Sequence, residues 1–281
     1  MNTALQKSFD NIAAAAEAAA GNNKEHLEQD GFLHCDICGE PTQTEVEAFG
    51  KKRTVRCICR CEREQRARKE QAAKKAARAR RIEFLRIQGF DNAEMQGWTF
   101  QNDDGKQPKV TKAARAYCER FEEFKQQRKG LLFYGNVGTG KTYAAACIAN
   151  ELISRGVPVL MTNFSRIINR LQERFEGRQK YLDSLNNFDL LIIDDLSAER
   201  NTEFMNEAVY TVIDARYRAG LPLIVTTNIN VQKMMSETEL ARQRIFSRVL
   251  EQCHPIEVAG SDRRVQAALD EYAEMNRLLG I

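Results

Sequence analysis

The second half of the chain alternates between short apolar runs and longer stretches of helix-forming composition. The apolar runs, each of four to nine residues, cover 130–134, 157–162, 188–196, 221–227 and 255–258. The stretches between and around them that predict helices are 111–128, 142–155, 165–185, 202–219, 237–252 and 262–279. Buried strands separated by helices are typical of a parallel sheet that is covered on both faces. The pattern therefore predicts an α/β domain with a five-stranded parallel sheet.

The pattern before residue 89 predicts smaller parts. Residues 42–46 and 51–56 alternate around Phe49-Gly50 and are expected to pair as a hairpin. Residues 63–88 contain neither Gly nor Pro and are dense in Ala, Arg, Lys, Glu and Gln, which favours a long helix. We therefore expect a helical or disordered arm over 1–30, a small module over 31–62, a basic helix or linker over 63–88, and the α/β domain over 89–281.

One glycine-rich motif lies between a predicted strand and a predicted helix. In this setting the form GxxxxGK[ST] binds ATP, because loop N–H groups and the helix N-terminus converge on phosphate oxygens. The lysine reaches the β- and γ-phosphates, and the threonine hydroxyl is placed to ligate magnesium. The predicted ATP site reads GNVGTGKT and comprises Gly135, Asn136, Val137, Gly138, Thr139, Gly140, Lys141 and Thr142.

Polar groups end two other predicted strands. The run LLIIDD delivers Asp194 and Asp195, and LPLIVTTN delivers Asn228. Ligands of such sheets bind at the carboxyl ends of the strands, so these side chains are expected beside the glycine-rich loop. We expect Asp194 to hold the magnesium ion, Asp195 to orient or deprotonate the attacking water, and Asn228 to bridge that water and the γ-phosphate.

Five of the eight cysteines fall within 27 residues, which in a chain with no export signal suggests a metal before disulfides. Cys35 and Cys38 form a C-x₂-C pair, while Cys57, Cys59 and Cys61 alternate as if on one side of a strand. Four thiolates around a structural zinc ion are expected, and we assign Cys35, Cys38, Cys59 and Cys61, with Cys57 as a substitute. Free or redox-active thiols and an iron–sulfur cluster are the alternatives.

Charge is distributed unevenly along the chain. The net charge is +3, yet residues 51–86 hold 15 Lys and Arg against four Glu. This segment either docks an anionic or acidic partner or is a solvated linker helix, and the sequence leaves both open. No stretch reaches the roughly 18 apolar residues that a membrane helix needs. We expect an unexported, cytoplasmic protein that does not enter membranes.

Taken together, GNVGTGKT, LLIIDDL, VTTN, RQRIFSRV (242–249) and GSDRR (260–264) resemble in order and spacing the AAA+ helicase loaders of the DnaC/DnaI family, particularly phage-type DnaC-like proteins. The resemblance covers roughly residues 90–270, and the cysteine-bearing segment is similar to the metal-binding module of some loaders. It implies an AAA+ P-loop ATPase core preceded by a zinc module and a basic helix.

The resemblance also implies roles for arginines. Arg248 resembles the finger that reaches a neighbouring subunit's γ-phosphate, with Arg244 in reserve. Arg264 resembles the sensor on the C-terminal helix, with an ambiguity of one position to Arg263. Asp195 departs from the glutamate common in AAA+ proteins, although paired aspartates are familiar among loaders, and the shorter side chain implies slow hydrolysis suited to a switch.

The partners implied are a hexameric replicative helicase, single-stranded DNA and further copies of the chain in a ring or spiral. The predicted helix 165–185 and the residue before it offer cations and aromatic rings for a DNA strand, although most of those rings fit a core equally well. The residues are Arg166, Arg170, Arg174, Phe164, Phe175 and Tyr181. ATP, magnesium and zinc are the expected cofactors. A transposition ATPase similar to IstB shares the motifs, but such proteins commonly lack a cysteine module. A nucleotide-gated adaptor that scarcely hydrolyses ATP is the third hypothesis.

Overall fold

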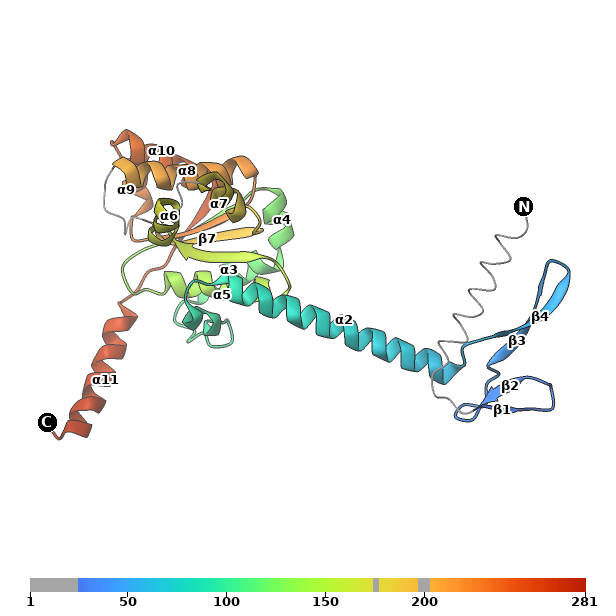
Figure 1. Cartoon of the computed structure of the whole chain (residues 1–281). Helices are drawn as coiled ribbons and strands as arrows, with labels where there is room; N and C mark the ends of the chain where they lie inside the picture. The colour runs from blue at the N-terminus through green and yellow to red at the C-terminus, as the bar shows by residue number, and fades with distance from the viewer. Residues whose placement is uncertain (1–24, 174–176, 197–202) are drawn as a thin grey trace. The chain divides into compact units, whose positions relative to one another are not determined.

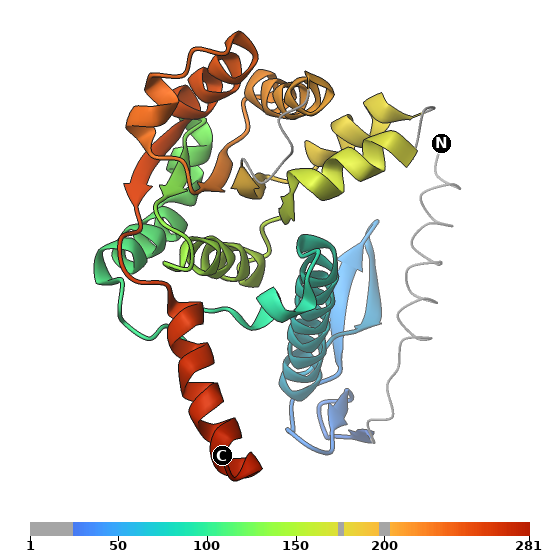
Figure 2. The same cartoon turned by 90° about the vertical axis from the view of Figure 1, so that its left-hand side faces the viewer.

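The computed structural model describes residues 25–173, 177–196 and 203–281. Two compact units divide the chain, Met1–Arg78 and Ala79–Ile281, and the division falls inside one long helix. Residues 1–24, and with them most of the predicted N-terminal arm, lie outside the described residues. Figures 1 and 2 show the elements from two directions.

The first unit contains two small antiparallel sheets. Strand β1 (Glu25–Leu27) pairs with β2 (Leu33–Cys35), and β3 (Gln43–Ala48) pairs with β4 (Lys51–Arg56). The predicted hairpin is therefore confirmed. At its turn Phe49 and Gly50 both have positive φ, 55° and 68°, as a two-residue turn of the twist-matched kind requires. Neither β1 nor β2 was predicted, and β1 joins residues 25–27 to the module.

Helix α2 (Arg60–Gly89) confirms the long basic helix and begins three residues earlier than predicted. Because it starts at Arg60, the cysteine run that we placed on one strand is split, and Cys61 lies in the first turn of the helix. The helix ends at Gly89, which packs against other residues of the second unit. A Cβ at Gly89 would lie 2.7 Å from Ile153 Cδ1 and 2.8 Å from the Val159 carbonyl oxygen, so only glycine fits there.

The second unit contains the predicted five-stranded sheet, and all of its strand pairs are parallel. The strand order is β6-β7-β8-β5-β9. The strands are β5 (Gly130–Tyr134), β6 (Val159–Asn163), β7 (Leu190–Leu196), β8 (Leu223–Thr227) and β9 (Cys253–Glu257). This arrangement confirms the α/β fold.

Helices cover both faces of this sheet, as the opposite sides of the ribbon in Figure 1 show. One apolar core lies between the sheet and helices α3 and α5, and the other lies under α6, α7, α8, α9 and α10. The bounds are η1 (Ala93–Gly97), α3 (Pro108–Glu119), α4 (Phe121–Gln126), α5 (Lys141–Ser154), α6 (Phe164–Glu173), α7 (Arg178–Leu185), α8 (Glu203–Ala219), α9 (Val231–Met235), α10 (Leu240–Gln252) and α11 (Arg263–Leu279).

Three helix predictions were wrong in detail. The stretch 111–128 is two helices, α3 and α4, which are separated at Arg120, where φ is −110°. The stretch 165–185 is also two helices, α6 and α7, the second of which begins after Gly177 at φ 125°. Helix α9 was not predicted, and α10 begins at Leu240 rather than at 237. These breaks change no strand, so the edge of the sheet that carries the polar residues is as expected.

A buried arginine connects helix α8 to the backbone just before strands β7 and β8. Arg216 is 1% exposed, and its guanidinium donates five hydrogen bonds to the backbone carbonyls of Leu185, Phe188, Asp189 and Pro222. Burial lowers the pKa of Arg216 to about 10, which still leaves it charged near neutral pH. The carbonyls at the starts of β7 and β8 are thus satisfied by one side chain.

Candidate nucleotide site and cysteine cluster

The glycine-rich loop joins β5 to α5 in the geometry that the motif requires. Gly135, Gly138 and Gly140 have φ of 143°, 73° and 103°, a region that side chains rarely allow. A Cβ at Gly135 would lie 2.4 Å from the Val258 carbonyl oxygen, so the loop presses against the chain that follows β9. Lys141 opens α5, and its Nζ donates to the carbonyls of Gly135 at 3.0 Å and Asn136 at 2.6 Å.

The two aspartates of β7 lie at a β-bulge. Ile193 pairs with Val225 and Leu196 with Thr227, so Asp194 and Asp195 share one residue of β8, which is Thr226. The extra residue explains why Asp195 has φ 58°, one of three non-glycine residues with positive φ among those described. Asp194 is partly buried and Asp195 is exposed.

Thr226 connects the two aspartates through one hydroxyl group. Its Oγ1 donates to Asp194 Oδ1 at 2.6 Å and accepts the Asp195 N–H at 2.9 Å. Asn228 follows at the end of β8, and its Nδ2 donates to Asp195 Oδ1 at 3.4 Å. Asp194, Asp195 and Asn228 therefore meet at one edge of the sheet, as the sequence predicts.

Burial shifts the two charged groups at the centre of the site in opposite senses. It raises the pKa of Asp194, and the hydrogen bonds from Thr226 and Thr142 oppose the shift. It lowers the pKa of Lys141, and the nearby charges of Asp195 and Asp194 oppose that shift. The lysine and the aspartates thus lower the cost of burying each other's charge.

The loop, the strand ends and the C-terminal segment enclose one cavity of about 460 Å³. Its lining includes most of the predicted nucleotide-site residues together with four others, Met95, Trp98, Tyr143 and Thr226. The full lining is Met95, Trp98, Gly138, Gly140, Lys141, Thr142, Tyr143, Asp194, Asp195, Thr226, Asn228, Arg263 and Arg264. The sequence did offer a signal for Thr226, because its hydroxyl belongs to the run VTT that immediately precedes Asn228 at the end of β8.

The segment before α11 packs directly onto the glycine-rich loop. The Arg263 N–H donates to the Gly138 carbonyl at 3.0 Å, and a Cβ at Gly138 would lie 1.8 Å from Asp262 Oδ1. Asp262 caps α11 by accepting the Arg264 N–H at 2.9 Å. We did not predict this contact, although an Asp before a helix is a capping signal in the sequence.

Both predicted sensor arginines line the cavity, but their guanidinium groups differ in ion pairing. Arg263 forms an ion pair with Asp104 at 3.2 Å. The side chain of Arg264 is 76% exposed and is 4.0 Å from Asp262. Arg264 is therefore the less constrained of the two.

The predicted finger arginines lie elsewhere in the same unit. Arg248 lies over the Tyr217 ring at 4.0 Å and pairs with Asp214 at 3.3 Å, while Arg244 lies over the Tyr210 ring at 4.3 Å. Both arginines line a hollow of about 490 Å³ on α8, α9 and α10, and neither lines the nucleotide cavity.

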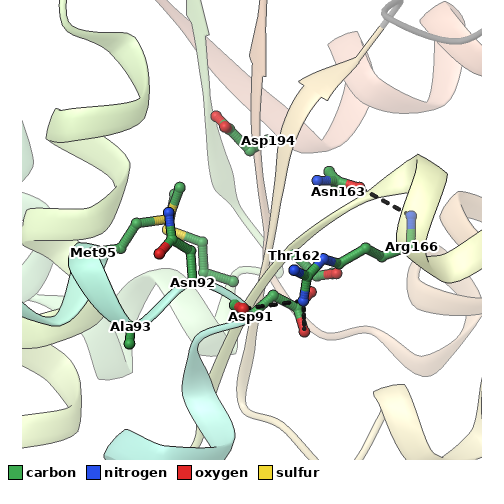
Figure 3. A pocket seen from close by; sticks show the side chains of 9 residues that line it. Asp91, Asn92, Ala93, Met95, Thr162, Asn163, Arg166 and Asp194 are labelled. Carbon is green, nitrogen blue, oxygen red and sulfur yellow. Dashed lines mark hydrogen bonds and ion pairs between the residues drawn. The ribbon is translucent and has the colours of Figure 1, made fainter.

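A second pocket of about 320 Å³ adjoins the nucleotide cavity, with which it shares Met95 and Asp194. Figure 3 shows Arg166 reaching across it from α6 toward Asp91. Arg166 Nη1 is 3.3 Å from Asp91 Oδ1 and donates to the Asp91 carbonyl at 3.0 Å. Asn163, opposite Asp194 in register, accepts the Arg166 N–H at 2.9 Å. Helix α6 is thus joined to the strand end beside Asp194.

The four assigned cysteines come together in the first unit. The sulfur atoms of Cys35, Cys38, Cys59 and Cys61 all lie within 4.8 Å of one another. Four sulfurs around zinc at about 2.3 Å lie roughly 3.8 Å apart, so this set fits a tetrahedral ion. Hydrogen bonds from the backbone N–H groups of Cys61 and Glu40 lower the pKa of Cys38 to about 6. Cys57 lies apart, and its thiol donates to the Pro41 carbonyl at 3.2 Å.

Comparison with known proteins agrees with this geometry. The profile of the family described as IstB-like ATP binding protein matches residues 41–270. The chain belongs to this ATP-binding family. Family members are AAA+ ATPases, so membership implies a capacity to hydrolyse ATP, and the predicted resemblance to DnaC and DnaI is confirmed.

Several curated relatives of this IstB-like chain are replicative helicase loaders. DnaC of Escherichia coli (strain K12) is 31% identical over 140 residues, 48% of this chain and 55% of DnaC. DnaI of Bacillus subtilis (strain 168) is 24% identical over 185 residues, 61% of this chain and 60% of DnaI. The chain thus spans little more than half the length of these relatives.

A crystal structure of DnaI supports the same fold. It superposes with a TM-score of 0.52 at 27% identity and covers 63% of this chain and 96% of the DnaI chain. Across the described residues of this IstB-like protein, no helix has both the length and the apolar character needed to span a membrane.

Proposed function

We propose that this chain is an ATP-dependent replication protein that loads a hexameric replicative helicase onto single-stranded DNA. The observation that carries the proposal is the cavity at the ends of β5, β7 and β8, which joins Lys141, both aspartates, Asn228 and Arg264. Similarity of the same region to DnaC, a replicative helicase loader, supports the choice of reaction partner. ATP binding and slow hydrolysis then act as a switch.

Each part of the cavity has a role in holding ATP. The loop N–H groups and Lys141 bind the β- and γ-phosphates, for which Lys141 leaves the carbonyls of Gly135 and Asn136. Thr142 and Asp194 hold magnesium, which neutralises charge on the phosphates. The hydrogen bond from Thr226 holds one oxygen of Asp194, and the other oxygen would be available to ligate the ion.

Asp195 and Asn228 position the attacking water. Their side chains are joined at 3.4 Å and both line the cavity, so one water can contact both. Asp195 is one methylene shorter than glutamate and is held at φ 58°, which limits its reach toward the γ-phosphate. This short reach supports slow basal hydrolysis, and we expect DNA or a partner to stimulate it.

Arg264 acts as the sensor, because its guanidinium lies at the cavity without a close ion pair, whereas Arg263 is occupied by Asp104. Arg248 acts in trans as the finger of a neighbouring copy, with Arg244 in reserve. Their position outside the cavity of their own chain supports a role between subunits of a ring or spiral.

A structural zinc ion held by Cys35, Cys38, Cys59 and Cys61 stabilises the N-terminal module. The module has only short strands and a small buried core, so bound metal supplies folding free energy that its packing lacks. The module faces the helicase in this proposal. A cytoplasmic location is consistent with both the loader role and reduced thiols.

Helix α6 and helix α7 provide the surface for the single strand. Arg170 lies 5.9 Å from the centre of the Tyr181 ring, which combines a cation with a face on which a base can stack. Phe164, a further predicted contact, is 1% exposed and belongs to the core. Arg174 and Phe175 lie outside the described residues.

A second function has one observation in its favour. The matching family bears the description IstB-like ATP binding protein, which supports a role as a transposition ATPase that assembles on target DNA. The third hypothesis, an adaptor with little hydrolysis, draws on the short side chain of Asp195.

The deciding experiment combines the purified chain, a hexameric bacterial replicative helicase and a fork coated with single-strand-binding protein. We expect unwinding to require the chain and ATP, to fail with Lys141→Ala, and basal ATP hydrolysis to rise with single-stranded DNA. ATP-dependent assembly on duplex DNA with no effect on the helicase would favour the transposition role. Hydrolysis that DNA does not stimulate at saturating ATP would favour the adaptor.

A further inference from the structure

Helix α2 carries a cationic stretch that no part of the ATPase mechanism uses. The stretch is residues 74–81, KKAARARR, and no acidic residue occurs between Glu70 and Glu83. All eight residues are exposed. The helix is uninterrupted by Gly or Pro until its last residue, so these charges are held on a stiff rod.

Most of the positive charge here is not neutralised within the described residues. The acids of α2 are already engaged: Glu62 pairs with Arg66, Glu64 with Arg68, Glu70 with Lys74 and Glu83 with Arg86. Lys75, Arg78 and Arg81 have no carboxylate within 4.0 Å in the part of the chain that the structure describes. A solvated helix balanced by i,i+4 pairs would not leave such a block.

The cations share one face of the helix. At 100° per residue, Lys74, Lys75, Arg78 and Arg81 fall within an arc of about 120° and along about 10 Å of axis. Between them, Ala76, Ala77 and Ala79 rise little above the helix surface, and Arg80 falls on the opposite side of the helix. This cationic face can therefore approach a flat, anionic backbone closely.

The amino-acid composition of α2 favours a phosphate backbone over a protein or a single strand as the partner of this face. From Arg63 to Arg81 no apolar side chain is larger than that of alanine, whereas the centre of a protein interface needs larger apolar or aromatic groups. Within α2 no aromatic residue occurs before Phe84, whereas single-strand binders rely on rings that stack on bases. What remains is contact with regularly spaced phosphates.

We propose that the cationic face Lys74, Lys75, Arg78 and Arg81 of α2 binds the phosphate backbone of duplex DNA without sequence preference. The contact is separate from the single-strand surface on α6 and α7 and does not depend on the helicase.

The test compares two full-length variants that remove equal charge. The face variant is Lys74→Gln, Lys75→Gln, Arg78→Gln and Arg81→Gln. The matched control replaces Lys52, Arg63, Arg66 and Arg68 by Gln, each of which has a carboxylate within 4.0 Å. Fluorescence anisotropy without nucleotide then follows a 20-base-pair duplex and a single strand of 20 nucleotides from 50 to 200 mM salt.

For the face variant we expect duplex affinity to fall at least tenfold at 50 mM salt. The slope of log affinity against log salt should decrease by about 3–4, since each phosphate contact contributes about 0.9. The control should change that slope by less than about 1, and single-strand affinity should change less than threefold in both variants. Unchanged basal ATP hydrolysis and helix content show that the variants are folded.

Four results would overturn the proposal. Equal weakening by the two variants would mean that only net charge matters. An unchanged salt slope in the face variant would show that these four side chains do not contact DNA phosphates. Equal loss of duplex and single-strand binding would show a contact that does not favour duplex DNA. Loss of helicase binding with DNA binding intact would make the face a protein-docking surface.

Discussion

The hydroxyl of Thr226 is the smallest group on which the nucleotide site depends. It donates to the Asp194 carboxylate and accepts from the Asp195 N–H, so one side chain holds the carboxylate of the first aspartate and the backbone of the second at the bulge. The sequence placed the aspartates on β7 but gave no sign of the bulge, because register shifts depend on pairing with another strand.

Thr226→Val should lower ATP hydrolysis about tenfold or more while ATP binding is retained. Asp194 must be ionised to hold magnesium, its pKa is already raised by burial, and loss of a donor raises that pKa further. The acidic limb of the pH–rate profile should therefore move to higher pH. Thr227→Val is the control, because the Thr227 hydroxyl donates to the Leu196 carbonyl and accepts from the Ile229 N–H instead of holding Asp194. An equal shift in that control would contradict the role of Thr226.

Arg216→Lys should lower the free energy of unfolding by about 3 kcal/mol or more. Lysine has three donors and no planar fork, so it cannot satisfy the four carbonyls that Arg216 contacts. Urea unfolding measures the change. Arg218→Lys, whose side chain is 77% exposed and pairs with Asp214, should change stability by less than about 0.5 kcal/mol. Similar losses for both variants would refute the assignment.

At the scale of elements, the strands were the most predictable part. Strand β5 was predicted at the observed bounds because a purely apolar run before a glycine-rich loop has one interpretation. The break between α6 and α7 was missed, since Gly177 interrupts a stretch that otherwise favours helix and tertiary packing decides the outcome. Helix α9 is only five residues long, too short to leave a periodic signal.

The contact between the glycine-rich loop and α11 also lies at this scale, and Gly138→Ala tests it. The new methyl group meets Asp262 and must adopt φ 73°, so nucleotide affinity should fall about tenfold. Asp262→Ala alone loses a helix cap, a cost of about 1 kcal/mol in stability. In the double variant part of the affinity should return. Calorimetric titration with a non-hydrolysable ATP analogue measures the nucleotide affinity of the two single variants and the double variant. If their effects on the binding free energy are additive within about 0.5 kcal/mol, the two residues do not interact.

At the scale of the whole molecule, the point at which α2 begins decides which of the five clustered cysteines come together. Sequence spacing alone left five thiols for four positions. The structure separates them because α2 begins at Arg60, which turns Cys61 toward Cys35 and Cys59 and leaves Cys57 beside Pro41.

Cys59→Ser should therefore abolish zinc binding, and Cys57→Ser should retain one zinc ion per chain. Atomic emission on the purified full chain measures the metal. Because the nucleotide cavity belongs to the second unit, basal ATP hydrolysis in both variants should stay within about twofold of the unmodified chain. Zinc retained by Cys59→Ser or lost by Cys57→Ser would overturn the assignment.

Assembly is the level at which the nucleotide site becomes complete in our proposal. Arg248 lies on a hollow away from its own cavity, so hydrolysis should need two copies. Arg248→Ala should bind ATP normally and fail to hydrolyse it, whereas Lys141→Ala should fail to hydrolyse ATP because it lacks a phosphate contact. In an equal mixture, about a quarter of the interfaces join an intact Lys141 site to an intact Arg248, so about a quarter of the activity should return. Arg244→Ala replaces Arg248→Ala as the control and should leave hydrolysis largely intact. A mixture no more active than either variant alone would place Arg248 outside the reaction.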